Sequence, residues 1–404
     1  MKTSLYIALF VAFVDYMGVG LIYPLFSSML FDSALPLLSP ETSHEMRGLW
    51  LGLLLSLMPL AQFFSSPIWG ALSDSKGRKK PLQLSLAIAL FGYITAFSGV
   101  LINSIALLLA SRVIIGFAAG NMSIVQATIA DISPPNEKAK NFGLYSMALG
   151  VGFTLGPFFG GSLATWGYSI PFLFASTITA LNLLFALIFF KESLHLTSAR
   201  KLSWSMGLVQ LQKAFRLKGF RAILLAAFLS CFGWSYFFEF TPVYLIARFH
   251  FTPSELGLFF GAAGGYYALS TGLLIRPFVR RFKAEVCLFG GMLLAALSIL
   301  AMPLLPSLIW IWPLMFLICF FVAFNWPTLT TLVSNNSPPE IQGEALGVLA
   351  SVNAAALVLS PLLSGSLVGA YPTLPMWAGG SVMLAGALIL LAVFRRQLFV
   401  RAET

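Results

Sequence analysis

Three charged side chains stand inside long apolar stretches, where a charged group is expensive and has a functional role by default. Asp15 lies in the first apolar run, Arg112 in the fourth and Glu239 in the seventh. A carboxyl group in such surroundings can bind and release a proton as its environment changes, whereas a guanidinium stays charged. The residue types therefore favour proton coupling, and we expect Asp15, Arg112 and Glu239 to perform it.

The composition requires a membrane around these charges. Hydrophobic residues make up 58% of the 404 residues and charged residues only 9%, whereas a soluble domain has roughly a quarter of its residues charged. These values exclude intrinsic disorder and a disulfide-rich secreted module. They also exclude a nucleic-acid binder, although the net charge is +10. The chain is predicted to be a multi-pass integral membrane protein, with membrane lipids around it.

Twelve apolar runs are long enough to be the elements that position the charges. A helix needs about 20 residues to cross a ~30 Å hydrocarbon core. The expected transmembrane helices are residues 5–30, 48–72, 81–101, 105–130, 140–163, 170–190, 221–247, 255–275, 285–305, 308–333, 343–368 and 375–395. The predicted fold class is an all-α membrane protein.

The distribution of Lys and Arg sets the orientation of these spans. With both termini in the cytoplasm, 21 of the 24 basic residues fall on the inside, and only Arg47 and Arg248 fall outside. Such a bias follows the positive-inside rule. We expect a location in the cell (inner) membrane with cytoplasmic N- and C-termini. The first apolar run is longer than a signal-peptide core and contains Asp15, so we expect it to be retained as helix one.

The chain is divided into two related halves. Residues 191–220 are the only long inside segment, which gives an N-terminal six-helix bundle (1–190), a cytoplasmic linker (191–220) and a C-terminal six-helix bundle with a short tail (221–404). Shifting residues 131–163 forward by 204 gives nine identities in 33 positions and also pairs Asn121 with Asn325. Parallel repeats of this kind indicate a transporter that binds its solute near mid-membrane and opens alternately to each side.

The turn between the second and third spans carries a specific motif, Gly70-Ala71-Leu72-Ser73-Asp74-Ser75-Lys76-Gly77-Arg78-Lys79-Lys80. Its bases suit an anionic cytoplasmic leaflet. The motif resembles the loop G-x-L-x-D-x-x-G-R-K of the major facilitator superfamily, and every specified position is present. The resemblance implies two pseudo-symmetric six-helix bundles and a charge cluster of Asp74, Arg78 and Asp131 that latches them. It also implies that Asp74 faces the start of helix eleven near Glu344. The alternative is that these charges only orient the spans.

Span five contains a set of small residues. Gly152, Gly156 and Gly160 share one helical stripe that allows another backbone to approach closely, and helix packing is one account of them. The complete pattern, G-x8-G-x3-G-P-x2-G-G, also resembles the motif that marks proton-coupled antiporters of the same superfamily. Its positions are Gly143, Gly152, Gly156, Pro157, Gly160 and Gly161.

The first span resembles helix one of the tetracycline and multidrug exporters in the drug:proton antiporter branch with twelve helices. It reads Asp15-Tyr16-Met17-Gly18-Val19-Gly20-Leu21-Ile22-Tyr23-Pro24. Asp15 should lie ~15 Å deep. Arg112, followed by Gly116, matches the family's span-four motif and is the cation expected to pair with Asp15. The alternative is a purely structural buried pair.

Candidate solute-binding residues are polar or aromatic and lie within spans. Glu239 precedes Pro242 and could bind a cationic solute, serve as a second proton site, or merely approach the outer surface. Helical periodicity places Gln126 on the Arg112 face of span four and turns Asn121 away from it. The expected contacts with solute are Tyr23, Gln126, Tyr236, Glu239, Tyr266, Asn325, Trp326 and Asn353. Cys231, Cys287 and Cys319 are expected to be packing residues, and no metal ligands are expected.

The prediction is a secondary active transporter, specifically a proton-coupled antiporter that exports a small organic compound, either a drug or a metabolite. We expect it to be a monomer that needs no cofactor beyond the coupling protons and no nucleic acid. The sequence leaves two alternatives: a proton-coupled importer of a nutrient, metabolite or siderophore on the same fold, and a membrane-embedded enzyme. We expect no catalytic residue, because no nucleophile elbow, zincin pair or closely spaced acid and base is present.

Overall fold

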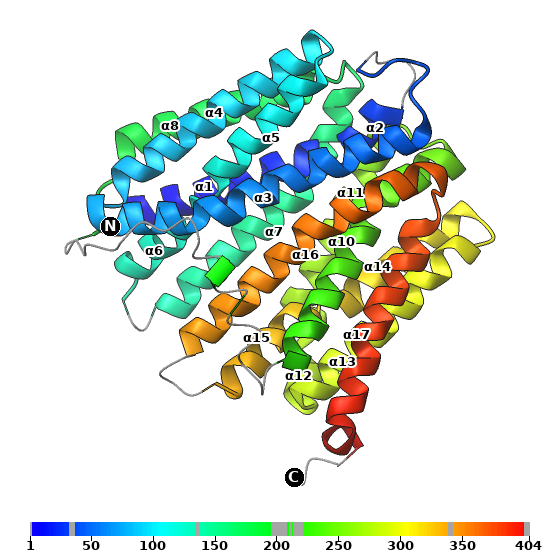
Figure 1. The fold of residues 1–404 in the computed structure, drawn as a ribbon. Coiled ribbons are helices and arrows are strands. Elements are labelled where there is room, and N and C mark those ends of the chain that lie inside the picture. The colour runs from blue at the N-terminus through cyan, green and yellow to red at the C-terminus, as the bar shows by residue number, and fades with distance from the viewer. Residues whose placement is uncertain are drawn as a thin grey trace. The chain divides into compact units, whose positions relative to one another are not determined.

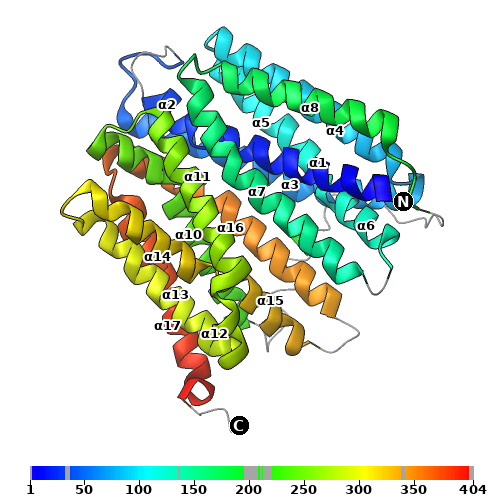
Figure 2. The same cartoon turned by 180° about the vertical axis from the view of Figure 1, so that it is seen from behind.

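The computed structural model describes residues 2–31, 37–134, 137–194, 208–209, 212, 221–337 and 342–399, and all regular structure in these residues is helical. Figures 1 and 2 show long helices along most of the chain. Within the described residues, twelve helical segments are long and apolar enough to cross a membrane, and they coincide with the twelve predicted spans. The predicted linker lies outside the described residues at 195–207, 210–211 and 213–220.

The helices of the first six spans differ from expectation mainly in being interrupted twice. They are α1 (Lys2–Ile22), α2 (Leu25–Phe31), α3 (His44–Lys76), α4 (Lys79–Leu101), α5 (Ile105–Ala119), α6 (Met122–Ile132), α7 (Lys138–Ala164) and α8 (Ile170–Phe189). Pro24 follows α1 and has no N–H to continue its hydrogen-bond ladder, so the first span continues as the separate helix α2.

The second six spans contain one π segment and two short 3₁₀ turns. Their elements are α10 (Arg221–Phe249), α11 (Pro253–Leu269), the π-helix η2 (Ser270–Leu274), α12 (Arg276–Arg281), α13 (Ala284–Ala301), η3 (Met302–Leu304), η4 (Leu308–Trp310), α14 (Ile311–Val322), α15 (Asn325–Asn335), α16 (Gln342–Ala370) and α17 (Leu374–Phe399). The eighth span continues through η2 to Arg281. Arg276 and Arg280, which follow the predicted span 255–275, therefore lie in a helix.

The internal repeat is visible in the helix interruptions. Span four breaks between α5 and α6 at Gly120 and Asn121, and span ten breaks between α14 and α15 at Ala323 and Phe324. The shift of 204 carries Gly120 onto Phe324. Pro157 in α7 and Pro361 in α16 are related by the same shift, and both lie inside unbroken helices. Spans four and ten thus share the approximate position of their break, and spans five and eleven share the position of a proline.

The chain divides into two compact units, which we call unit 1 and unit 2. Unit 1 comprises Met1–Thr42, Leu53–Gly207 and Phe251–Gly264, and unit 2 comprises Ser43–Gly52, Leu208–His250 and Gly265–Thr404. In unit 1, α1 packs against α7 and α8, and α4 packs against α5 and α8. In unit 2, α10 packs against α16 and α17. Asp15 and Glu239 therefore lie in different units, each on a helix that contacts the fifth span of its own half.

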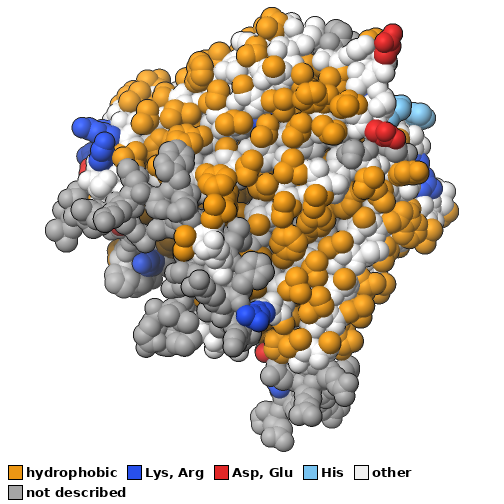
Figure 3. Space-filling model, in the orientation of Figure 1, with side chains coloured by type: hydrophobic (Ala, Val, Ile, Leu, Met, Phe, Trp, Pro, Cys, Tyr) orange, Lys and Arg blue, Asp and Glu red, His pale blue; other side chains and the backbone are white. Residues whose placement is uncertain are grey.

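The surface has the chemistry of a membrane protein. Figure 3 shows hydrophobic side chains over most of one face, with charged side chains gathered toward its margins. Large apolar residues are widely exposed, including Phe91, Ile188 and Leu363. Apolar patches of this extent are rare on soluble monomers and suit contact with lipid.

Candidate functional site

Asp15 lies in α1 of unit 1, and a polar side chain other than the predicted Arg112 lies beside it. The side chain of Asn121, at the break between α5 and α6, lies within hydrogen-bonding reach of the Asp15 carboxyl group. The second carboxyl oxygen, Oδ2, is buried without a hydrogen-bond partner. The predicted direction of Asn121 relative to Arg112 rests on a rotation of 100° per residue, which cannot be extended through the break at Gly120.

Arg112 is buried on α5 but does not form the expected ion pair with Asp15. Its Nε donates to the backbone oxygen of Leu54 at 3.0 Å, and its Nη2 lies 3.0 Å from the sulfur of Met58. The guanidinium also stacks 5.1 Å from the centre of the Phe26 ring. Among the described residues, the ion pairs within 4.0 Å are both made by Arg78. Arg112 is thus held by α3 and α2, while Asn121 takes the place next to Asp15.

The glycines of span five hold α1, the helix that carries Asp15, directly against α7. A methyl group added to Gly152 would lie 2.5 Å from the backbone oxygen of Phe13, and one added to Gly156 would lie 2.5 Å from that of Met17. Gly160 is in similar contact with the backbone of Leu21. These contacts bracket Asp15 along α1, so the glycine stripe sets its position.

The remaining members of the glycine motif have other surroundings. A methyl group on Gly161 would lie 2.4 Å from the backbone oxygen of Pro253 at the start of α11, within unit 1. A methyl group on Gly143 would meet nothing within 4 Å. Pro157 packs its ring against α1, 2.9 Å from a methyl group placed on Gly20. Close helix packing therefore accounts for most of the motif but not for Gly143.

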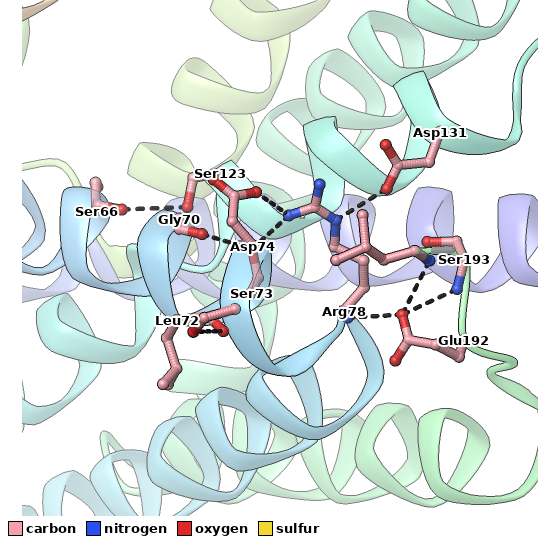
Figure 4. Close-up of polar contacts among 12 residues, drawn as sticks. Ser66, Gly70, Leu72, Ser73, Asp74, Arg78, Ser123, Asp131, Glu192 and Ser193 are labelled. Atoms are coloured by element: carbon pink, nitrogen blue, oxygen red, sulfur yellow. Dashed lines mark hydrogen bonds and ion pairs between the residues drawn. The ribbon is translucent and has the colours of Figure 1, made fainter. Parts of the chain in front are cut away.

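The predicted charge cluster at the α3–α4 turn is assembled around Arg78 (Figure 4). The Arg78 guanidinium donates to Asp131 Oδ2 at 2.9 Å and to Asp74 Oδ1 at 2.6 Å. It also donates to the hydroxyl of Ser73 at 2.7 Å. Burial acts to lower the pKa of Arg78, but its two carboxylate partners outweigh burial and raise it. The cluster ties the end of α3, the turn and the end of α6 together.

Glu192 is a member of this cluster that the sequence analysis missed. Its carboxylate follows α8 and accepts backbone N–H groups from Arg78 at 2.7 Å and from Lys79 at 3.0 Å. It also accepts the backbone N–H groups of Ser193 and Leu194. The carboxylate thereby satisfies N–H groups at the start of α4 and serves as a cap supplied from a distant part of the chain. No local motif marks such a residue.

Gly77 is the residue that makes room for Glu192. Its φ is +85°, a conformation that favours glycine, and a methyl group there would lie 2.5 Å from Glu192 Oε2. Position 77 therefore requires glycine for two reasons, its positive φ and the space taken by the Glu192 carboxylate. The expected contact between Asp74 and the helix-eleven region near Glu344 involves a side chain outside the described residues.

Glu239 occupies a polar surface of α10 in unit 2. Its side chain is 6% exposed, and Oε2 has no hydrogen-bond partner. Further buried polar atoms without a partner lie on the same helix, in Ser235, and on α16, in Asn353 and Ser360, while the Tyr236 hydroxyl lies within hydrogen-bonding reach of Ser364. The two helices touch there, because Cys231 Sγ lies 3.6 Å from the backbone oxygen of Asn353. A buried polar atom without a partner is costly, so this surface is suited to a ligand that supplies hydrogen bonds.

The other predicted solute contacts are spread over both units. Asn325 Nδ2 donates to the Ser230 hydroxyl of α10 at 2.9 Å, and its Oδ1 has no partner. Trp326 is 48% exposed, and Tyr266 packs edge-on against Phe316. In unit 1, Gln126 donates to the Tyr145 hydroxyl at 3.0 Å, and Tyr23 lies partly buried at the end of α1. Asn325 and Asn353 thus lie on helices that contact the Glu239 helix.

Comparison with known proteins places this geometry in a family. A family model described as Major Facilitator Superfamily matches residues 8–361. The quinolone resistance protein NorA of Staphylococcus aureus is 28% identical over 397 residues, which are 97% of this chain and 96% of that protein. The class C tetracycline resistance protein of Escherichia coli is 28% identical over 405 residues, with 97% and 96% covered.

Solved structures share the fold. The human organic anion transporter MFSD10 (TETRAN) has a TM-score of 0.72 at 24% identity and covers 96% of this chain and 99% of its own. A D-xylose-proton symporter has a TM-score of 0.77 at 16% identity and covers 96% and 97%. At these identities the structures support the fold and leave the solute open.

Proposed function

The chain belongs to the Major Facilitator Superfamily, and from that premise we propose that it is a proton-coupled antiporter that exports a small organic compound by alternating access. The observation that carries the proposal is the buried carboxyl group of Asp15, placed by the glycine stripe of α7 and reached by Asn121. The names of two relatives of nearly equal length, which concern quinolone and tetracycline resistance, support a drug-like solute.

The proposed cycle assigns different roles to the two acids. A proton entering from outside binds Asp15, removes its charge and biases the equilibrium between outward-open and inward-open states. Glu239 and the polar atoms around it hold the solute, and a cationic group on the solute would satisfy the carboxylate. One charge moving through 100 mV provides about 2.3 kcal/mol, enough for an accumulation ratio of tens. Arg112 stays charged and is held against α3.

The Arg78 cluster is proposed to act as the conformational latch. Its bonds join α3, α6 and the start of the linker in unit 1, so breaking them would free these ends to move. We further propose that the protein is a monomer in the cell membrane with cytoplasmic termini, and that residues 1–190 and 221–404 are the moving halves around a linker at 191–220. The positive-inside bias supports the orientation.

Proton flux in proteoliposomes tests the function directly. Purified protein is reconstituted with a pH-sensitive dye inside, a pH gradient is imposed, and a quinolone or a tetracycline is added. Antiport predicts solute movement opposite to the proton and a flux that requires Asp15. Movement of solute and proton in the same direction would instead establish the importer. Glu41→Gln, which removes an exposed loop carboxylate, is the matched control and should leave the flux unchanged.

A further inference from the structure

Tyr93 is a buried residue of α4 to which neither the motifs nor the proposed cycle gives a role. Its side chain is 4% exposed, and it belongs to unit 1. The neighbouring Gly92 brings α4 against α5, since a methyl group there would lie 2.6 Å from Ile115 Cγ1. Ile115 lies one turn from Arg112 on α5. The close contact at Gly92 thus holds Tyr93 beside the helix of the buried guanidinium.

The hydroxyl of Tyr93 reaches α1 next to Asp15. A methyl group added to Gly18 would lie 2.3 Å from the Tyr93 hydroxyl oxygen and 3.1 Å from Cζ. Gly18 follows Asp15 by three residues and therefore lies on the same side of α1. Any larger residue at position 18 would push the hydroxyl away, so the glycine is what admits it.

Both buried charges act on Tyr93. Asp15 and Arg112 both lie within electrostatic range of its phenol group. The other titratable groups near Asp15 are Tyr16 on α1 and Tyr145 on α7. The described α8 sequence contains no ionisable residue, and those of α3 lie in its terminal turns. Tyr93 is therefore the polar group shared by the acid and the base.

We infer that Tyr93 is a positioning residue that transmits the protonation state of Asp15 to Arg112. This inference rests on the proposed role of Asp15 in proton exchange. A phenol hydroxyl can both donate and accept. When Asp15 is ionised, the hydroxyl donates toward the carboxylate. When Asp15 is protonated, the hydroxyl no longer faces a negative charge and its oxygen can accept from the guanidinium. The Tyr93 hydroxyl thus has two orientations, and the protonation state of Asp15 selects between them.

Tyr93→Phe tests the inference because it keeps the ring beneath Gly18 and removes only the hydroxyl. Infrared difference spectra of the purified protein follow the carboxyl stretch of Asp15, identified as the band that disappears in Asp15→Asn. A lost hydrogen bond to the charged form favours the protonated form, so the midpoint should move to higher pH by about one unit. Tyr267→Phe, which removes a partly buried phenol hydroxyl in unit 2, should leave the midpoint unchanged.

A second variant changes the same contact between Tyr93 and Gly18 on the α1 side. Gly18→Ala keeps the hydroxyl but displaces it, and we expect a shift of the same sign. A midpoint in Tyr93→Phe within about 0.2 units of the wild type would overturn the inference, whatever Gly18→Ala does. The spectra need no solute, so they decide the role of Tyr93 even if the transport assay contradicts antiport. If antiport holds, the pH profile of the proton flux should shift with the spectral midpoint.

Discussion

The fifth span of each half carries a stripe of small residues at corresponding positions, but the residue types differ between the halves. In α7 the stripe is Gly152, Gly156 and Gly160, and its glycines lie against the backbone of the Asp15 helix. The shift of 204 carries these positions onto Ala356, Ser360 and Ser364 of α16, which packs against the Glu239 helix. Ser360 Oγ is buried without a partner. In the first half the stripe brings two helix backbones into direct contact, whereas in the second half two of its three residues carry hydroxyl groups.

This difference explains why two buried acids can have separate tasks. Asp15 is fixed by backbone contact and lies near two groups that suit a proton, Asn121 and Tyr93. Glu239 lies among unpartnered polar atoms that suit a larger ligand with several hydrogen-bonding groups. A shared scaffold with a changed stripe thereby yields one unit for the proton and one for the solute, which is our proposal for how the repeat diverged.

The largest effect is expected from Asp15→Asn. The amide keeps the size of the side chain but cannot exchange a proton, so solute-driven proton flux should fall at least about 100-fold. Solute binding, measured as thermal stabilisation of the purified protein, should change less than about threefold. Equal losses of flux and binding in this variant would show that Asp15 also holds the solute and would remove the division of tasks.

Glu239→Gln should give the reverse result. Charged hydrogen bonds contribute about 1.5–3 kcal/mol, so the affinity for a permanently cationic probe such as ethidium should fall roughly 10- to 100-fold. The affinity for an uncharged probe such as chloramphenicol should stay within about threefold. Stabilisation by the two probes is compared at several pH values. Unchanged binding of the cation at every pH would contradict the role of Glu239.

The sequence predicted the transmembrane helices but only some of the contacts between buried side chains. Apolar run length and basic-residue bias depend on composition, so the twelve spans were recoverable, and the turn motif correctly grouped Asp74, Arg78 and Asp131. The Asp15–Arg112 pair was wrong because α3 supplies the Leu54 carbonyl, an interaction between helices that periodicity cannot show. The direction of Asn121 could not be derived from periodicity because the helix breaks before it. Glu192 and Tyr93 were missed because neither stands in a recognisable pattern.

Gly156→Ala should have the next largest effect and tests whether backbone contact at the stripe matters. The new methyl group would lie 2.5 Å from the Met17 oxygen and 2.8 Å from the Leu21 nitrogen. Overpacking of this kind destabilises by about 1–3 kcal/mol, and the displaced α1 should lower proton flux. Gly143→Ala is the matched control, since it has open space and removes a helical glycine. It should be neutral or slightly stabilising. Equal thermal unfolding midpoints in the two variants would refute the packing role.

The smallest effect is expected at Glu192, where only the pH dependence of stability distinguishes capping from surface charge. Partial burial acts to raise the pKa of Glu192, but four backbone N–H groups outweigh it and hold the pKa below the ordinary 4.5. A lowered folded pKa means that the stabilisation is complete above the unfolded pKa and is lost as the pH falls through the folded one.

Glu192→Gln should therefore lower the free energy of unfolding by about 1 kcal/mol or less at neutral pH, because the group is largely exposed. The difference from the wild type should shrink below about pH 4.5. Urea unfolding in detergent at several pH values measures it, with Glu41→Gln as the exposed control. A constant difference down to pH 3 would mean that the carboxylate charge does not cap α4. The latch would then depend on Arg78 and its two aspartates alone, and the first half would hold the α3–α4 turn by ion pairs without help from Glu192.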